Sequence, residues 1–265
     1  MAATTTVGIV SIHRAPENVP KHVLDLALKQ LVDVLVIHPF VQQNFKKVEL
    51  VLQTTYLDEH YKKVGLEHPF PTAVLLIECD SVENYVKVLT HPDLVPLFAG
   101  ADAQFGFKSH ASVFSADVAI RLHRPAPEDG SPHATAMALM KVPHGLHPQE
   151  HNASLDACFE EWIRMPQQEK HLRKHVIWTP NDELDGHLAE IGFPKREHLL
   201  IAEIQGETVE DLKAILEHPE LDDLFRGRTK WGHPFENSDC FSSDVTTRLA
   251  VDETGRVVVF PDIPM

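Results

Sequence analysis

The sequence has few cysteines, and none stands in a pair that would indicate a disulfide framework or a zinc site. Its 265 residues include only Cys79, Cys158 and Cys240, which lie far apart and form no CxxC motif. Small secreted domains depend on closely spaced disulfides, and zinc ribbons need paired cysteines. We therefore interpret all three as reduced thiols. None has a neighbouring histidine that would recommend it as a nucleophile.

An excess of positive charge and long apolar runs are also missing. The chain carries 24 Lys and Arg against 39 Asp and Glu, a formal net charge of −15. Such a chain repels a phosphate backbone or an anionic bilayer, so neither nucleic acid nor membrane is an expected partner. No run approaches the roughly 20 apolar residues that a membrane span needs, and the N-terminus has no signal-peptide pattern. We expect a soluble cytoplasmic protein.

The motifs of several large enzyme classes are absent as well. The sequence contains no GxGxxG, GxxxxGK[ST] or GxSxG pattern and no kinase signature. Dinucleotide-binding, P-loop and α/β-hydrolase functions are therefore not supported. Among its 18 histidines, His147 and His151 are four apart, as are His171 and His175, but no HExxH pattern accompanies either pair. We predict no metal site.

What the sequence does contain is a duplication with a constant offset of 127 residues. Residues 72–122 and 199–249 follow one plan, and the matching positions are His91 and His218, Phe98 and Phe225, Ser115 and Ser242, Asp117 and Asp244, and Arg121 and Arg248. A fixed period decides the architecture before any other pattern does, and this period has the size of a common domain. We predict one domain over residues 1–123, a linker rich in proline and acid over 124–132, a second domain over 133–250 and a tail over 251–265.

Each copy is predicted to run strand, helix, strand, strand, helix, strand. The predicted strands are 5–13, 48–52, 73–78 and 111–122, then 134–142, 175–179, 200–205 and 240–250, with a last edge strand over 256–260. The predicted helices are 21–37, with a continuation or restart across His38-Pro39, and 154–163, capped by Ser154; two more open at Ser81 and Thr208. This order is the ferredoxin-like one. The predicted fold is therefore α+β: two tandem ferredoxin-like repeats packing sheet to sheet, each covering the open face of the other.

One block of the first copy resembles a known superfamily. Residues 81–94 contain Ser-Val-Glu-Asn-Tyr and His-Pro-Asp-Leu, and a strand later runs into Ser-Ala-Asp-Val at 115–118. This block resembles the dimeric α/β-barrel superfamily, which includes antibiotic-biosynthesis monooxygenases, stress-responsive barrel proteins and polyketide cyclases. The resemblance implies a fused tandem form of the barrel, with a ligand pocket inside it or between sheet and helices. It also implies acid/base chemistry without metal, flavin or nicotinamide, although some members bind haem.

Alternation along the strands selects candidate site residues, because every second side chain shares a face. On the first strand we expect Ser11 and His13 to face the barrel and Val10 and Ile12 to face the helices. A buried imidazole or carboxylate has a shifted pKa, which suits acid/base catalysis. The predicted catalytic residues are His13 and His110 as base and acid, Tyr56 (or else Tyr61) as a hydroxyl donor, and Glu203, which interrupts an apolar strand. The predicted substrate contacts are Ser11, Ser112, Trp178, Asp239, Phe114 and Phe241.

These residues favour a small-molecule enzyme without a cofactor, acting on a polyketide-like or aromatic intermediate as cyclase, decarboxylase, dehydratase or monooxygenase. One alternative is a non-catalytic ligand-binding or stress-response barrel, in which the histidines are surface residues and the aromatic residues plain core. Another is a haem-binding barrel with His60, His110 or His233 as axial ligand. An open pocket of at least about 300 Å³ would favour the enzyme, and a packed interior would favour the binding protein. The protein is expected to be a monomeric pseudo-dimer or a homodimer.

Overall fold

The computed structural model describes residues 6–66, 69–124, 133–219, 223 and 238–261. Its first half contains β1 (Val7–Arg14), α1 (Lys21–Ile37), α2 (Pro39–Asn44), β2 (Phe45–Thr54), α3 (Asp58–Lys63), β3 (Thr72–Cys79), α4 (Val82–Thr90), α5 (Val95–Phe105) and β4 (Ala111–His123). Its second half contains β5 (Ala134–Lys141), α6 (Pro148–Ile163), α7 (Pro166–His171), β6 (Lys174–Asn181), α8 (Asp185–Glu190), β7 (Leu199–Gly206), α9 (Val209–Leu216), β8 (Asp239–Val251) and β9 (Val257–Val259).

Eight of the strands close into an antiparallel barrel. The order is β2-β3-β1-β4-β6-β7-β5-β8, and β8 pairs with β2 to complete the circle. The first four strands come from the first half of the chain and the next four from the second, in the same internal order. The halves meet twice, at β4–β6 and at β8–β2. The expected α+β barrel is therefore present, and closure leaves none of these eight strands with a free edge.

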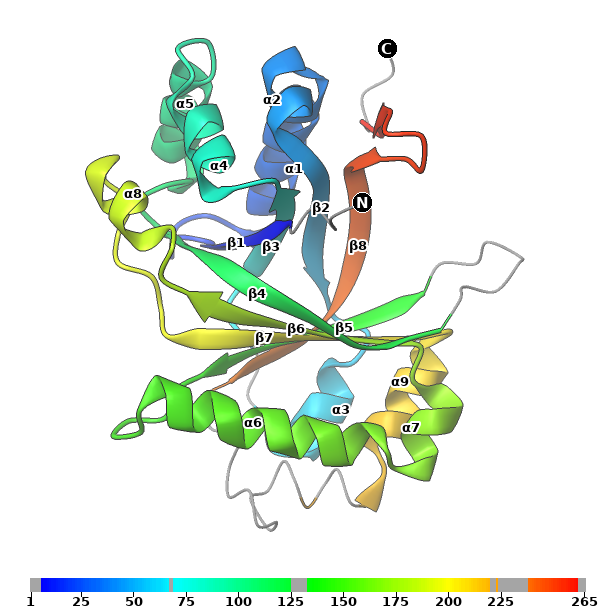
Figure 1. The fold of residues 1–265 in the computed structure, drawn as a ribbon. Helices are drawn as coiled ribbons and strands as arrows, with labels where there is room; N and C mark the ends of the chain where they lie inside the picture. Colours follow the sequence, from blue (N-terminus) through cyan, green and yellow to red (C-terminus); the bar gives the residue numbers. More distant parts are fainter. Residues whose placement is uncertain (1–5, 67–68, 125–132, 220–222, 224–237, 262–265) are drawn as a thin grey trace.

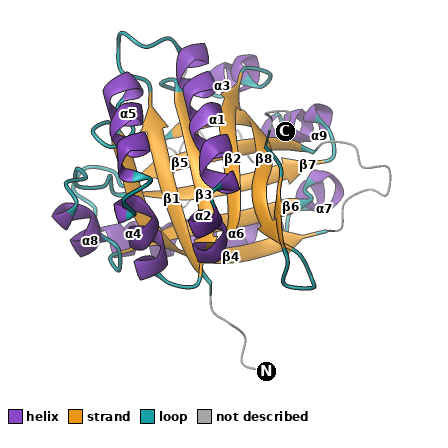
Figure 2. Ribbon diagram, turned by 90° about the horizontal axis from the view of Figure 1, so that it is seen from above, coloured by secondary structure: helices purple, strands orange, loops and turns teal. Residues whose placement is uncertain are grey.

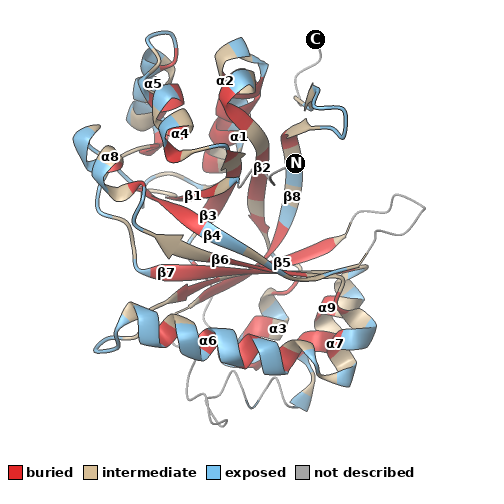
Figure 3. Ribbon diagram, viewed as in Figure 1, coloured by how far each residue is buried: buried red, intermediate tan, exposed pale blue. Residues whose placement is uncertain are grey.

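Helices cover the outside of the barrel in two layers (Figure 1). The helices α1, α2, α4 and α5 lie across the strands of the first half, as the view from above shows (Figure 2). The helices α6, α7 and α9 cover the second half. Each layer buries one apolar cluster against the outer face of the strands, and a third apolar cluster fills the inside of the barrel. Coloured by burial, most of the strand residues and the inward helix faces are buried, whereas parts of β4 and β8 and the outward helix faces are exposed (Figure 3).

Two short helices cross from one half to the other. The helix α3 follows β2 of the first half, yet Leu57 and Tyr61 belong to the apolar cluster of the second half. In return α8 follows β6 of the second half, yet Leu184 and Leu188 belong to the cluster of the first half. Figure 1 shows α3 beside α9 and α8 beside α4 and α5. Neither short helix was expected from the sequence, and together they interlock the two halves.

An arginine near the end of each half's last strand reaches the first long helix of the other half. Arg248 in β8 forms an ion pair with Asp33 in α1 at 3.3 Å, and both side chains are buried. Arg121 in β4 forms an ion pair with Glu160 in α6. Asp33 and Glu160 are themselves 127 positions apart, as are the two arginines. Positions related by this offset therefore make corresponding contacts that join the halves, although the contact at Arg121 is less buried than the one at Arg248.

Histidine followed by proline begins two of the helices. His38 caps α2 and His147 caps α6, each accepting a backbone N–H at Nδ1 two residues later. Proline at the first helical position needs no hydrogen-bond acceptor, and its φ suits a helix. The predicted start of the second long helix at Ser154 is wrong, because His147 and Pro148 begin it earlier.

The structure also tests the predicted helix caps at Thr208 and Ser81, the last strand and the linker. Thr208 does cap α9, through a reciprocal capping box with Asp211. Ser81 stands at the start of α4 but makes no side-chain hydrogen bond of the capping kind. The strand β9 pairs only with the end of β8, which places it at an edge as predicted. The predicted linker, residues 124–132, lies outside the described residues except for Arg124. Among the described helices, none is both long and apolar enough to cross a membrane.

The buried and exposed copies of the arginine contact predict different stabilities for matched variants. Arg248→Met removes the buried ion pair with Asp33, and such losses cost about 3–5 kcal/mol. Arg121→Met removes ion pairs with Asp156 and Glu160, whose carboxylates are exposed, and a smaller loss of about 1 kcal/mol is expected. Urea unfolding of both variants measures the difference. Equal losses would show that the buried pair does not hold the barrel seam.

Candidate functional site

The inside of the barrel is filled by side chains. The apolar cluster there consists of Val10, Ile12, Val51, Val74, Leu76, Phe114, Ala116, Met137, Leu139, Val176, Trp178, Leu199, Ile201 and Phe241. Three predicted substrate contacts, Trp178, Phe114 and Phe241, are therefore members of a packed core. Phe114 and Phe241 have no exposed surface. These three rings act as barrel filling rather than as the wall of an open pocket.

The expected orientation of the first strand is wrong. Val10 and Ile12 face the barrel interior, whereas Ile9 lies in the cluster under the helices. A Cβ added to Gly8 would lie 2.8 Å from the Trp178 ring, which confirms that this parity of β1 faces inward. Both faces of β1 are buried and both carry apolar residues, so alternation alone could not tell one from the other. Ser11 and His13 consequently share the opposite face, toward the helices.

His13 is enclosed between the sheet and α5. Its Nε2 lies 2.8 Å from the Ser11 hydroxyl, and its ring stacks on Phe107 with centroids 5.0 Å apart. Phe105 meets the same ring edge-on. Burial lowers the pKa of His13 to about 3, because the protonated ring would lose its hydration. A neutral imidazole with so low a pKa is a weak base near neutral pH.

The other predicted catalytic residues do not gather around His13. His110 is exposed beside Gly106. Tyr56 donates its hydroxyl to the backbone oxygen of Ser243 and to Asp244, and packs against the core of the second half. The alternative donor Tyr61 is buried in that core. The predicted acid/base constellation is thus spread over separate parts of the molecule.

Glu203 does face the barrel interior, as predicted, but its carboxylate is already paired with Lys174 and hydrogen-bonded to Gln205. The carboxylate lies 2.9 Å from Lys174 Nζ and 2.7 Å from the side-chain amide of Gln205. Burial lowers the pKa of Lys47, but Glu49, Glu78 and Glu203 outweigh it and raise that pKa on balance. Lys47 and Glu203 come from opposite halves of the chain. Together with Lys174 and Gln205 they form a polar network that fills one end of the barrel.

A second polar group occupies the barrel near Asp239. This carboxylate lies 3.2 Å from Arg14 and 3.0 Å from Lys141. Arg14 also pairs with Glu197, whose backbone N–H donates to the Ser112 hydroxyl at 2.9 Å. The predicted substrate contacts Ser112 and Asp239 therefore face inward, but their polar atoms are already used in hydrogen bonds and ion pairs within the protein. Their arrangement is that of a polar plug.

An apolar cleft of about 390 Å³ lies outside the barrel, between α4, α5 and the connection from α8 to β7. Its lining is mostly apolar: Leu89, Thr90, Val95, Phe98, Ala99, Asp102, Phe107, Lys108, Ile191 and Phe193. The first eight come from the first half of the chain and the last two from the second. The crossing of α8 therefore creates the cleft, which no pattern in the sequence announced.

The polar groups of this cleft lie next to its aromatic wall. The Lys108 ammonium lies 5.5 Å from the centre of the Phe193 ring and donates to the backbone oxygen of Ile191. The Asp102 carboxylate accepts backbone N–H groups from Lys108 and Ser109, both at 2.8 Å. These contacts lower the pKa of Asp102 although burial opposes them. Asp102 thus fixes the turn that carries Lys108, and Lys108 brings a positive charge to an apolar site.

A stack of rings connects the cleft to His13. Phe98 lies parallel to Phe107 with centroids 5.3 Å apart, and Phe107 in turn stacks on His13. Phe98 and Phe107 line the cleft, whereas His13 lies behind them. The sequence pattern pointed to His13 but not to Phe98 and Phe107, because the stack joins β1 to α5 and to the turn after it, which are distant in the sequence.

A second cleft, of about 320 Å³, lies where α6 begins and is more polar. His147, Asn152, Asn181, Arg196 and His198 contribute to its lining. The Arg196 guanidinium is held by Asp185 at 2.9 Å. None of the ten predicted site residues lines either this cleft or the apolar one.

The histidines suggested as metal or haem ligands are mostly committed elsewhere. His171 pairs with Asp211 at 2.6 Å, and His60 pairs with Glu217 at 2.9 Å. His175 is buried between Phe159 and Trp162, where desolvation first and then Arg121 lower its pKa to about 3.

The haem alternative gains no support from these positions. Neither of the two described clefts is lined by His60 or His110. The third suggested axial ligand, His233, lies outside the described residues. His60 and His110 therefore do not support a haem site in either of these two clefts.

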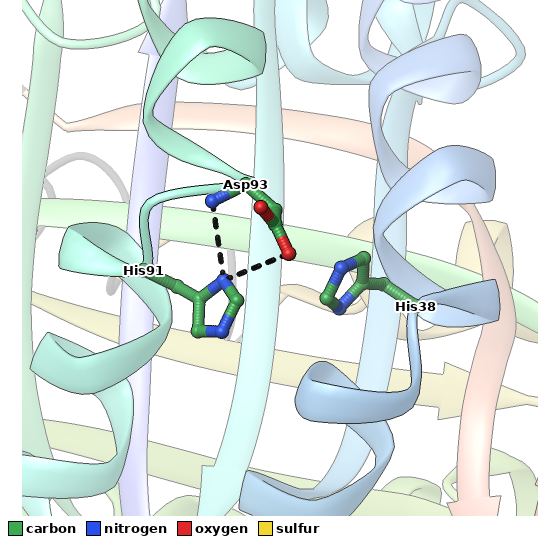
Figure 4. Close-up of side chains that lie close together, drawn as sticks. All are labelled: His38, His91 and Asp93. Atoms are coloured by element: carbon green, nitrogen blue, oxygen red, sulfur yellow. Dashed lines mark hydrogen bonds and ion pairs between the residues drawn. The ribbon is translucent and has the colours of Figure 1, made fainter.

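One cluster of metal-ligating side chains was missed from the sequence. His38, His91 and Asp93 lie close together on the outer helix layer of the first half, with ligand atoms within 4.8 Å of one another (Figure 4). His38 and His91 are 53 positions apart in the sequence, but each precedes a proline. This shared dipeptide was the only available signal, and it indicates helix ends rather than proximity.

The low pKa of His13 predicts how stability depends on pH. The unfolded chain binds a proton on this residue below about 6.5, whereas the folded chain binds it only below about 3. Stability should therefore fall as the pH drops through this window, by up to about 1.4 kcal/mol per pH unit for this group. His13→Phe keeps a ring in place and should make the slope shallower, as measured by urea unfolding between pH 7 and 4. Parallel slopes would mean that His13 takes up a proton over the same pH range in the folded protein as in the unfolded chain.

Comparison with known proteins adds information on the fold only. The sequence matches no protein-family model and no curated protein. A structure from Fusobacterium nucleatum, provisionally named a monooxygenase, has a TM-score of 0.53 and 9% identity over 99% of this chain and 98% of that one. An anthrone oxidase-like protein has a TM-score of 0.56 and 12% identity over 91% and 93% of the two chains. Identities this low show a common fold only, and the barrel fold shared with these two structures fits the dimeric α/β-barrel resemblance of the sequence.

Proposed function

We propose that this protein is an enzyme that acts on an apolar, aromatic small molecule bound in the cleft between α4, α5 and the connection from α8 to β7. The observation that carries the proposal is the cleft itself, about 390 Å³ in volume with Phe98, Phe107 and Phe193 in its lining. That volume suits a drug-sized ligand, and mostly apolar walls with a few polar groups are typical of such sites.

Lys108 gives the proposed site its chemistry. An ammonium group beside apolar walls stabilises a nearby anion more strongly than it would in water. A phenol or an enolisable ketone bound against Lys108 would therefore lose its proton more readily. Cyclisation, decarboxylation, dehydration and cofactor-independent monooxygenation can each pass through such an anion, so the proposal covers all four. The names of the two structural neighbours, a monooxygenase and an anthrone oxidase-like protein, are consistent with an aromatic substrate.

The duplication supports a specific view of the architecture. We infer that the chain is a fusion of two ferredoxin-like units, because both halves have the same strand order and repeat the arginine contact at Arg121 and Arg248. Such a fusion allows one half to keep a site that the other lacks. In the cleft, Ile191 and Phe193 of the second half close a space that the first half forms.

A non-catalytic binding protein is the second candidate. It is favoured by the filled barrel interior and by His13, which is buried and neutral behind Phe107. In that case the same cleft would hold an aromatic ligand without converting it.

Ligand binding at Lys108 can be tested with a matched pair of fluorescent probes. Anilinonaphthalene sulfonate is an aromatic anion, and N-phenylnaphthylamine is its neutral analogue. Lys108→Met should weaken binding of the anion by about tenfold, a loss of about 1.4 kcal/mol, and leave binding of the neutral probe unchanged. Equal effects on both probes would exclude a charge-specific role for Lys108.

Catalysis is tested separately with an anthrone as trial substrate. The wild-type protein should consume oxygen and form a product detectable by mass spectrometry, whereas Ala99→Trp, which fills the cleft, should do neither. Ile120→Trp is the control, because Ile120 is exposed and lies outside the cleft lining. Tight anthrone binding with no product would support the binding protein, and turnover by Ala99→Trp would show that the chemistry occurs elsewhere.

A further inference from the structure

A second site lies on the outer helix layer, where two helix junctions meet. His38 separates α1 from α2, and His91 and Asp93 lie in the turn between α4 and α5. The imidazole rings have centroids 5.5 Å apart, and the Asp93 carboxylate lies 3.9 Å from His91 Nδ1. In Figure 4 the carboxylate lies between the two rings. Both histidines are half-buried, whereas Asp93 is exposed.

We propose that His38, His91 and Asp93 bind a divalent transition-metal ion, with zinc as the best match. Two imidazoles and one carboxylate are common zinc ligands, and three protein ligands leave a fourth position for water. Imidazole nitrogen also selects zinc, nickel, cobalt and copper over calcium and magnesium, which prefer oxygen.

The geometry needs only small side-chain movements to close around an ion. Ligand atoms in a tetrahedral zinc site lie about 3.3 Å apart, given bonds of about 2.0 Å. The three ligand atoms already lie within 4.8 Å of one another. Asp93 is exposed and free to rotate inward, while Phe40 packs on the His91 ring at 4.1 Å and holds it in place. Asp93 would therefore make most of the movement needed to close the site around an ion.

The backbone caps compete with the metal, which gives the site a distinctive signature. His38 Nδ1 accepts the N–H of Phe40 at 3.2 Å, and His91 Nδ1 accepts the N–H of Asp93 at 3.3 Å. A neutral imidazole has one lone-pair nitrogen, so a ring that ligates a metal must release its cap. Both caps are at or beyond the usual length limit of an N–H hydrogen bond, so releasing them costs little. The amides of Phe40 and Asp93 should then lose their acceptors when the metal binds.

The site would tie two parts of the helix layer together. Leu89 and Thr90, just before His91, and Val95, just after the turn, all line the apolar cleft. An ion held by His38 and His91 would thus fix one wall of that cleft against the junction of α1 and α2. The site itself does not depend on the cleft being catalytic.

The test uses the untagged full-length chain, stripped with EDTA and titrated with zinc by calorimetry, with native mass spectrometry to count bound ions. Wild type should bind one ion with high affinity. His38→Asn and His91→Asn keep a side chain that can cap a helix but does not ligate zinc well, and each should lower the affinity by about 100-fold. Asp93→Ala should also weaken binding. His147→Asn is the matched control, because His147 makes the same cap before a proline but is not in the cluster, and it should bind as wild type does.

Amide spectra of ¹⁵N-labelled protein provide an independent readout. Zinc should shift the signals of Phe40 and Asp93 in wild type and leave them unshifted in His91→Asn. The proposal fails if wild type binds no zinc, or if His38→Asn and His91→Asn bind it as tightly as wild type does. The latter result would place the ion on other histidines of this chain.

Discussion

The closure of the barrel depends on contacts that pass from each half of the chain to the other. Arg248 is the clearest case, because its buried guanidinium meets Asp33 of the opposite half and cannot be hydrated if that contact breaks. Closure also removes strand edges that would otherwise pair with other molecules. The interlocking helices α3 and α8 add apolar burial across the same seams. A half alone would leave these groups exposed to water.

Closure also decides where a ligand can bind. Eight strands enclose a space just wide enough for side chains to fill, and here Phe114, Phe241 and Trp178 fill it, with charged groups at both ends. Both clefts found among the described residues lie outside the barrel. The apolar cleft therefore results from the same crossing of α8 that packs the two halves together, since Ile191 and Phe193 directly follow that helix.

The histidines divide according to their surroundings. His13 and His175 are buried among aromatic rings, and desolvation keeps them neutral well below physiological pH. His38, His91 and His147 instead sit at helix ends, where a neutral ring nitrogen accepts a backbone N–H. A histidine-rich acidic sequence thus uses one residue type for core packing and for capping. Where two capping rings happen to face each other beside an aspartate, the same groups acquire the geometry of a metal site.

The sequence by itself determined the order of the strands along the chain and the α+β barrel class, because the 127-residue offset between matching positions and the local periodicity are properties of the chain alone. Alternation along the strands also placed Glu203 and Asp239 on inward faces, and Glu203 stood out because it interrupts an otherwise apolar strand. Only the tertiary structure decided which face of β1 points inward, because both faces are buried and both carry apolar residues. It alone brought Phe193 to Lys108 and His38 to His91, since these pairs are separated by 85 and 53 positions and no local pattern encodes a meeting between distant turns.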